Sequence, residues 1–244
     1  MTTTNDGNLG LLAGRRIAVT GANRGLGAAL AKAFVEAGAD VLVHARSADA
    51  AALSLSDSGA RGAVAGELVD PRLGPELAAK AREVLAPGLD VLVLNAGIIS
   101  TMGKLEDADM VEFRHVMEVN VDAQLRLFVA CLPQLLASRG TVIWMSSGVG
   151  RFGVPGYGAY GVSKHALEGL HRAAHAEYGA QGLVSLAVAP GMVQTDMLRA
   201  ARGTQDVSAF TPPPVAAAGF VRLLAAINER RDELAGASVD IDNF

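Results

Sequence analysis

A serine, a tyrosine and a lysine stand at spacings that suit acid–base chemistry. Ser147 precedes Tyr160 by thirteen residues, and Lys164 follows the tyrosine by four. In a helix beginning near Tyr160, residues four apart lie on one face, so the phenol and the ammonium are neighbours. An ammonium within about 4–6 Å lowers a phenol pKa that is ordinarily near 10. The serine hydroxyl is then expected to steady the oxygen of a polarised carbonyl.

The composition excludes several other classes of protein. The chain has 244 residues, half of them hydrophobic, which suits one large α/β domain. The net charge of −4, without a Lys/Arg cluster, predicts no nucleic-acid partner. No apolar run approaches the ~18 residues of a membrane span, and the N-terminus lacks the pattern of a signal peptide. We therefore expect no membrane contact and a cytoplasmic location, which the single cysteine, Cys131, also suits.

Apolar runs alternate with amphipathic stretches along the chain. Seven runs are predicted as strands, over residues 16–20, 41–44, 62–69, 90–94, 140–145, 183–189 and 239–241. Helical spacing predicts helices over 26–37, 75–85, 107–136 with a break near Pro133, 160–178 and 214–229. Strands that are apolar throughout and alternate with helices indicate a parallel sheet covered on both faces. The sequence predicts one doubly wound, Rossmann-type α/β domain over residues 12–244, preceded by a flexible arm over residues 1–11.

A glycine-rich turn follows the first predicted strand. Gly21, Gly25 and Gly27 permit a tight turn and let a diphosphate approach backbone N–H groups at the start of a helix. The alternative is a tight turn without a ligand. Because the turn follows the first strand and opens an amphipathic helix, the spacing favours a dinucleotide site. The residues between the glycines that are expected at this site are Asn23, Arg24 and Leu26.

The end of the second predicted strand carries no carboxylate. The chain reads His44-Ala45-Arg46-Ser47, with no acid until Asp49. A carboxylate there would bond the ribose 2′-hydroxyl and repel a 2′-phosphate. Arg46 and Arg24 instead offer guanidinium groups for phosphate, unless both are simply solvated. We therefore expect a preference for NADP(H), with NAD(H) as the alternative.

Further strand ends carry small or polar residues. Asp70 is expected either to bond the adenine amino group or to form a turn before Pro71. Asn95-Ala96-Gly97 ends the fourth strand, where small residues let a cofactor lie against the backbone. Asn120 lies mid-helix, and is expected to bind a bent helix backbone or an ordered water. Ligands bind at the carboxyl ends of such strands, so these residues are predicted to share one cleft.

In these motifs the chain resembles the short-chain dehydrogenase/reductase superfamily. The matched elements, in the family's order and at its usual spacings, are Thr20-Gly21-x3-Gly25-x-Gly27, Asp70, Asn95-Ala96-Gly97, Asn120, Ser147, Tyr160-x3-Lys164 and Pro190-Gly191-x3-Thr195. The resemblance covers residues from about 12 to 200, with a looser fit beyond. It implies an NADP(H)-dependent oxidoreductase that interconverts a carbonyl and a secondary alcohol.

The resemblance also implies roles for single residues. Tyr160 would be the acid–base at the carbonyl oxygen, and Ser147 would orient that oxygen. Lys164 would lower the tyrosine pKa and bond the nicotinamide ribose, while Asn120 would hold a water in a proton relay to Lys164. The segment that would fix the cofactor's carboxamide contains Pro190, Gly191, Val193 and Thr195.

Residues 192–214 correspond to the family's mobile substrate lid. The residues flanking the expected cleft, which either form an apolar substrate pocket or simply pack, are Phe152, Val154, Tyr157, Met192, Met197 and Phe210. The C-terminus, Val239 to Phe244, departs from the family's aspartate–glycine–glycine turn, so a homodimer and a homotetramer both stay open. His171 and His175 stand four apart without a third ligand, so no metal is expected.

Two other functional classes compete with the oxidoreductase. A dinucleotide-binding regulator or redox sensor on this fold would bind NADP(H) without turnover, but would be expected to lose the Tyr160/Lys164 pair. A lyase on the same fold would keep the serine and tyrosine but lose the lysine and the glycine turn. Both features are intact here, which favours the oxidoreductase.

Overall fold

The computed structural model of the chain describes residues 8–244, which contain one sheet of seven parallel strands. The strands are β1 (Arg16–Val19), β2 (Asp40–Ala45), β3 (Gly62–Ala65), β4 (Val91–Leu94), β5 (Thr141–Met145), β6 (Val184–Ala189) and β7 (Ser238–Asp240). Their order across the sheet is β3-β2-β1-β4-β5-β6-β7. The order reverses between β1 and β4, which is the switch point where such sheets bind ligands.

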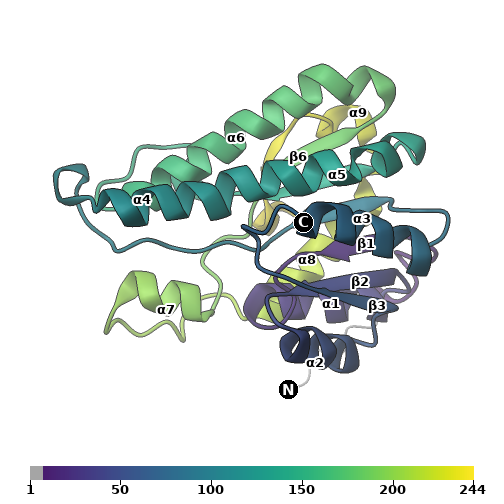
Figure 1. Cartoon of the computed structure of the whole chain (residues 1–244), viewed down its shortest axis with the longest axis horizontal. Coiled ribbons are helices and arrows are strands. Elements are labelled where there is room, and N and C mark those ends of the chain that lie inside the picture. The colour runs from purple at the N-terminus through teal and green to yellow at the C-terminus, as the bar shows by residue number, and fades with distance from the viewer. Residues whose placement is uncertain (1–7) are drawn as a thin grey trace.

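Helices cover both faces of the sheet (Figure 1). The helices α1 (Gly25–Glu36) and α8 (Pro213–Ala226) pack together on one face. The other face is covered by α3 (Leu73–Val84), α5 (Ala123–Ala137) and α6 (Gly158–Tyr178). The remaining helices are α2 (Ala48–Ser58), α4 (Met110–Met117), α7 (Asp196–Arg202) and α9 (Arg231–Leu234). The predicted doubly wound α/β architecture is confirmed.

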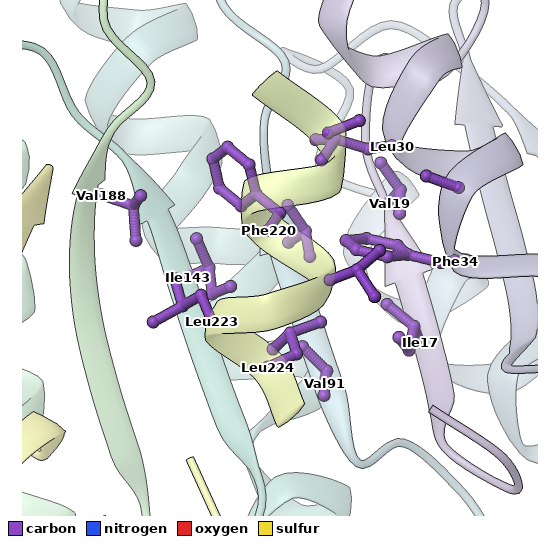
Figure 2. Packing of buried hydrophobic residues seen from close by; sticks show 14 of the residues in the cluster. Ile17, Val19, Leu30, Phe34, Val91, Ile143, Val188, Phe220, Leu223 and Leu224 are labelled. Atoms are coloured by element: carbon purple, nitrogen blue, oxygen red, sulfur yellow. The ribbon is translucent and has the colours of Figure 1, made fainter. Parts of the chain in front are cut away.

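Strand residues alternate between two hydrophobic cores. Ile17 and Val19 of β1 belong to the core under α1 and α8, whereas Ala18 between them belongs to the core on the opposite face. Figure 2 shows α8 between Ile143 of β5 on one side and Phe34 of α1 on the other. Successive strand side chains point to opposite faces, so a strand covered on both sides reads as a continuous apolar run.

Two segments between β2 and α3 differ from the sequence expectation. The strand expected over 62–69 ends at Ala65, because the chain turns after the Gly66 N–H bonds the Ala45 carbonyl. Helix α2 was not predicted, since only Ala51 and Ser54 of its eleven residues are buried and its hydrophobic pattern is weak.

The long helical stretch is interrupted near Asn120, whereas the helix continues through Pro133. The predicted break near Pro133 is therefore wrong. Helices α4 and α5 join through a π-helical turn, Glu118–Asp122. Pro133 lies inside α5, where it removes one backbone hydrogen bond. The buried side chains of Phe128, Cys131 and Leu135 pack on the sheet around it and hold the helix together.

The N-terminal segment meets the end of α1. Residues 1–7 of the predicted arm lie outside the described residues. Leu12, directly after the arm, is buried, and its N–H donates to the Ala37 carbonyl at 3.0 Å. Within residues 8–244, every helix falls short of the length and hydropathy that a membrane span requires.

Candidate active site

The tyrosine and lysine of α6 lie against the end of β5. Both side chains are buried, and Lys164 Nζ lies 5.4 Å from the centroid of the Tyr160 ring. Lys164 Nζ also donates a hydrogen bond of 2.7 Å to the Met145 carbonyl oxygen, at the last residue of β5. The Ser147 hydroxyl, two residues later, is close enough to the Tyr160 phenol to lower its pKa. The structure therefore brings together the serine, tyrosine and lysine that the sequence singled out.

Burial determines the protonation state of this pair. It raises the pKa of Tyr160 to about 12, an effect opposed by the hydrogen bond from Ser147. Burial also lowers the pKa of Lys164 to about 8. The sequence led us to expect a lowered tyrosine pKa, whereas desolvation of the phenolate is the larger effect here. At neutral pH both side chains carry their proton.

Asn120 lies in the π-helical turn and links three segments. Its Oδ1 accepts from the Ile98 N–H at 2.8 Å, and its Nδ2 donates to the Ile98 carbonyl at 2.8 Å. Nδ2 also donates to Ser163 Oγ at 3.0 Å, and Ser163 Oγ donates to the Tyr160 carbonyl at 2.8 Å. Both amide hydrogens are therefore used. The side chain joins the segment after β4 to the helix that carries the tyrosine.

The glycine turn uses backbone conformations that favour glycine and packs closely on α1. Gly21 and Gly25 have φ of +66° and +56°, a region that favours glycine. A Cβ on Gly27 would lie 2.1 Å from the Gly21 carbonyl oxygen, so the start of α1 packs directly on the turn. Arg24, the residue before α1, makes no side-chain cap. The first N–H groups of α1 thus have no side-chain cap, a feature that suits an anion.

Thr20 and Asn95 join the glycine turn to β4. Thr20 Oγ1 accepts from the N–H groups of Asn95 and Ala96, each at 3.0 Å. Asn95 Nδ2 donates to the Thr20 carbonyl at 2.9 Å. A Cβ on Gly97 would lie 3.0 Å from Asn120 Oδ1, so the tripeptide also touches the π-helical turn. The backbone N–H and the side-chain amide of Asn95 therefore hold the end of β4 against the residue before the glycine turn.

His44 lies beneath the turn, and sequence reasoning gave it no role. The Gly21 N–H donates to its Nδ1 at 3.3 Å, and Nε2 lies 2.9 Å from the Gly66 carbonyl oxygen. Burial lowers its pKa, which favours the neutral ring that these two contacts require. A polar residue within the apolar run VLVHA is the signal that identifies it.

The residues expected at the cofactor's adenosine end lie in different environments. Asn23 and Arg46 are exposed, and Arg46 makes no hydrogen bond or ion pair with the described residues. Leu26 is a core residue, so only its backbone faces the turn. Asp70 bonds the N–H and the guanidinium of Arg72, which is the turn-forming alternative. These bonds lower the Asp70 pKa to about 2.

The base of the lid segment adjoins the glycine turn. Thr195 Oγ1 accepts from the Leu198 N–H at 3.2 Å and so caps α7. A Cβ on Gly25 would lie 3.3 Å from the Thr195 methyl carbon. Arg24 pairs with Asp196 at 3.3 Å, between exposed side chains. Helix α7 projects from the body of the molecule (Figure 1).

The other residues of the carboxamide segment precede this contact. Pro190 follows β6 directly, and Gly191 has φ of +74°. Val193 is buried and pairs with Thr211, which closes the lid segment into a loop at its base.

Apolar side chains stand exposed near the candidate site. Phe152, Met192 and Met197 are 70%, 47% and 37% exposed. The Tyr157 ring lies 6.5 Å from the Tyr160 ring, between centroids. Tyr157 thus contacts the tyrosine directly, whereas the structure gives no such contact for the other three.

Among residues 8–244, no three metal-binding side chains form a cluster. His171 is fully buried, with Nδ1 3.3 Å from Ser185 Oγ. His175 packs against Gly236, where a Cβ would lie 2.4 Å from the ring. The two histidines therefore occupy packing positions.

Comparisons with known proteins agree with this fold. A model of the short chain dehydrogenase family matches residues 15–206. The uncharacterized oxidoreductase MT0954 of Mycobacterium tuberculosis is 36% identical over 78% of this chain and 74% of its own. Glycine betaine reductase ATRR of Emericella nidulans is 35% identical over 84% of this chain, which spans 16% of that protein. A short chain dehydrogenase of Shigella flexneri, solved with NADP, superimposes with a TM-score of 0.85 at 28% identity, over 96% of this chain and 99% of its own.

Proposed function

Because the chain belongs to the short chain dehydrogenase family of oxidoreductases, we propose that it transfers hydride between NADP(H) and a carbonyl or secondary alcohol. The observation that carries the proposal is the buried Tyr160, with Ser147 at its phenol and Lys164 beside its ring. The cofactor supplies the hydride and the protein supplies position and a proton.

The protonation states support the reductive direction of this chemistry. Tyr160, whose pKa is raised to about 12, holds the proton that a carbonyl oxygen must receive. Ser147 orients that oxygen beside the phenol. The Lys164 ammonium, next to the Tyr160 ring, stabilises the negative charge that develops on the phenol as its proton leaves. Asn120 holds α6 in place through Ser163 and would also hold a water in a proton relay to Lys164.

The dinucleotide would lie across the ends of β1 and β4. Its diphosphate fits the turn formed by Gly21, Gly25 and Gly27, and Thr195 faces that turn. Arg46 has no partner among the described residues, and Arg24 has only an exposed one. Both guanidinium groups are therefore available to a 2′-phosphate, which favours NADP(H) over NAD(H).

The substrate is proposed to be neutral and apolar, and the protein a homodimer or homotetramer. Phe152, Tyr157, Met192 and Met197 would line the substrate side of the cleft. Apolar residues of α4 and α5, including Val111 and Val129, are exposed and suit contact between copies. Light scattering coupled to size exclusion measures the oligomeric state.

Cofactor oxidation tests the proposed reaction. NADPH consumption should be followed over a panel of ketones, diketones, quinones and aldehydes, with NADH in parallel. We expect turnover of at least one apolar carbonyl, with NADPH bound more tightly than NADH. NADPH binding without turnover across the panel would favour a regulator or redox sensor, whereas turnover that does not consume NADPH would favour a lyase.

A further inference from the structure

Glu168 is a buried carboxylate that extends the line of catalytic candidates on α6. Tyr160, Lys164 and Glu168 are spaced by four residues, so they occupy one face of the helix. The glutamate is 1% exposed. A carboxylate buried to this extent is costly unless hydrogen bonds compensate for the water it loses. The groups that donate hydrogen bonds to the Glu168 carboxylate therefore indicate which parts of the structure it holds in place.

One oxygen of Glu168 binds both ends of the segment that carries Ser147. Oε1 accepts from Ser146 Oγ at 2.7 Å and from Arg151 Nε at 3.2 Å. Between these two residues lie Ser147 and a short 3₁₀ helix, Gly148–Gly150. The segment from 146 to 151 is thus closed onto α6 at its start and at its end.

The same segment makes two further contacts, with β6 and with α6. The Ser146 N–H donates to the Val188 carbonyl at 2.8 Å, which holds its backbone to β6. A Cβ on Gly150 would lie 2.8 Å from the Lys164 carbonyl oxygen, so the 3₁₀ helix packs directly on α6. Ser147 therefore lies in a loop that is held by β6, by the α6 backbone and by the Glu168 carboxylate.

The second oxygen of Glu168 faces a different part of the molecule. Oε2 accepts from Ser238 Oγ at 2.5 Å and from Arg172 at 3.4 Å. Arg151 also reaches β7, where it bonds the Val239 carbonyl at 2.7 Å and Asp240 at 3.0 Å. These contacts hold the carboxylate in one orientation and tie Arg151 to β7.

We propose that Glu168 is a positioning residue, which acts through Ser146 and Arg151 to hold Ser147 against Tyr160. The inference rests on the proposed oxidoreductase function, in which Ser147 orients the carbonyl oxygen. A hydroxyl that is misplaced by a fraction of an ångström loses much of its effect on the transition state, while the cofactor, bound at the other strand ends, is little affected.

The test compares two serines that each donate to the same carboxylate. Ser146→Ala removes the bond at Oε1, and Ser238→Ala removes the bond at Oε2. Ser146→Ala is expected to lower kcat about tenfold with the NADPH Kd within about twofold of wild type. Ser238→Ala is expected to lower the melting temperature to a similar extent and to leave kcat within about twofold. Glu168→Gln, if it folds, should lower kcat more than Ser146→Ala.

A second readout does not depend on turnover. In protein labelled with 3-fluorotyrosine, the three tyrosines give ¹⁹F resonances that Tyr157→Phe and Tyr160→Phe assign. Ser146→Ala should move the Tyr160 resonance in the same direction as Ser147→Ala, and Ser238→Ala should not move it. A Tyr160 resonance and a kcat that Ser146→Ala leaves unchanged overturn the inference. If the wild type turns over no carbonyl, the proposed function fails and the ¹⁹F shifts alone decide whether Glu168 positions Ser147.

Discussion

The side chain of Asn120 pairs with both backbone groups of Ile98, accepting from its N–H and donating to its carbonyl, each at 2.8 Å. Ile98 follows β4, and Asn120 lies in the π-helical turn before α5. These two hydrogen bonds hold the π-helical turn against the segment after β4, which is neither helix nor strand.

Asn120→Ala should destabilise the fold by about 3 kcal/mol, because it leaves the part-buried N–H and carbonyl of Ile98 without this partner and removes one of the two hydrogen bonds of Ser163. Chemical denaturation measures the loss. Gln134→Ala is the control, since this buried amide makes one hydrogen bond within residues 8–244, to the Ala78 carbonyl, and its loss should cost less. If the two variants lose the same free energy of unfolding, the Asn120 hydrogen bonds contribute no more to stability than the single Gln134 bond.

Tyr160→Phe should lower kcat by about a thousandfold, because it removes the proton that the carbonyl oxygen receives. The NADPH Kd should stay within about twofold, since the ring still packs beside Lys164. Stopped-flow and fluorescence titration measure the two quantities. Tyr157→Phe, which changes the neighbouring phenol, is the matched control and should keep most of the activity. A Tyr160→Phe enzyme with wild-type kcat contradicts the assignment.

The pH dependence of reduction should report Lys164. Its pKa, lowered by burial to about 8, means that the ammonium is present below that pH and is lost above it. The Tyr160 phenol, with a pKa raised to about 12, keeps its proton throughout this range. We expect kcat/KM for NADPH-dependent reduction to fall as the pH rises through about 8. In Lys164→Arg the fall should move to higher pH, and a fall that stays near pH 8 would assign it to another group.

Arg46→Ala should weaken NADPH binding by about tenfold or more, because a guanidinium bonded to phosphate contributes roughly 1.5–3 kcal/mol. NADH affinity should change by less than about twofold. Isothermal titration with both cofactors measures the difference. Arg61→Ala, which removes an arginine paired with Asp40 by the amino end of β2, is the control and should alter neither affinity. Equal loss of NADPH and NADH affinity would count against a 2′-phosphate contact.

Two glycines should respond to alanine in opposite ways. A Cβ on Gly27 would lie 2.1 Å from the Gly21 carbonyl oxygen, so Gly27→Ala should abolish dinucleotide binding or folding. Gly169, in the middle of α6, has open space around its Cβ position. Gly169→Ala should stabilise the protein by about 0.5–1 kcal/mol, as expected for a helical site. Thermal unfolding and NADPH titration of both variants check the contrast.

The sequence predicted much of the sheet because each strand is covered on both faces. The run DVLVL, for example, contributes Val91 to one core and Leu92 to the other. Helix α2 escaped prediction because its exposed face leaves only two buried residues and a weak pattern. Pro133 suggested a break because proline disfavours the interior of a helix. The packing of Phe128 and Leu135 on the sheet, which keeps the helix intact, cannot be derived from local propensity.

The candidate site was predictable as a set of residues but less so as an electrostatic environment. The spacing of Tyr160 and Lys164 placed them on one helix face, which the structure has. The direction of the tyrosine pKa shift depends on burial by distant segments, which spacing alone does not give. Glu168 was not singled out, because its partners Ser146, Arg151 and Ser238 come together only in the folded chain.

Helix α8 sits over Ile17, Val19 and Ile143, strand residues made much earlier in the chain (Figure 2). It begins at Pro213, so these side chains lack the part of their cover that α8 provides until residues 213–226 have been synthesised. Because a ribosome shields the most recent part of a nascent chain, the domain completes this core only after α8 has left the ribosome. During translation this apolar face is open to chaperones, and a chain stopped before Pro213 is left with a surface that promotes aggregation.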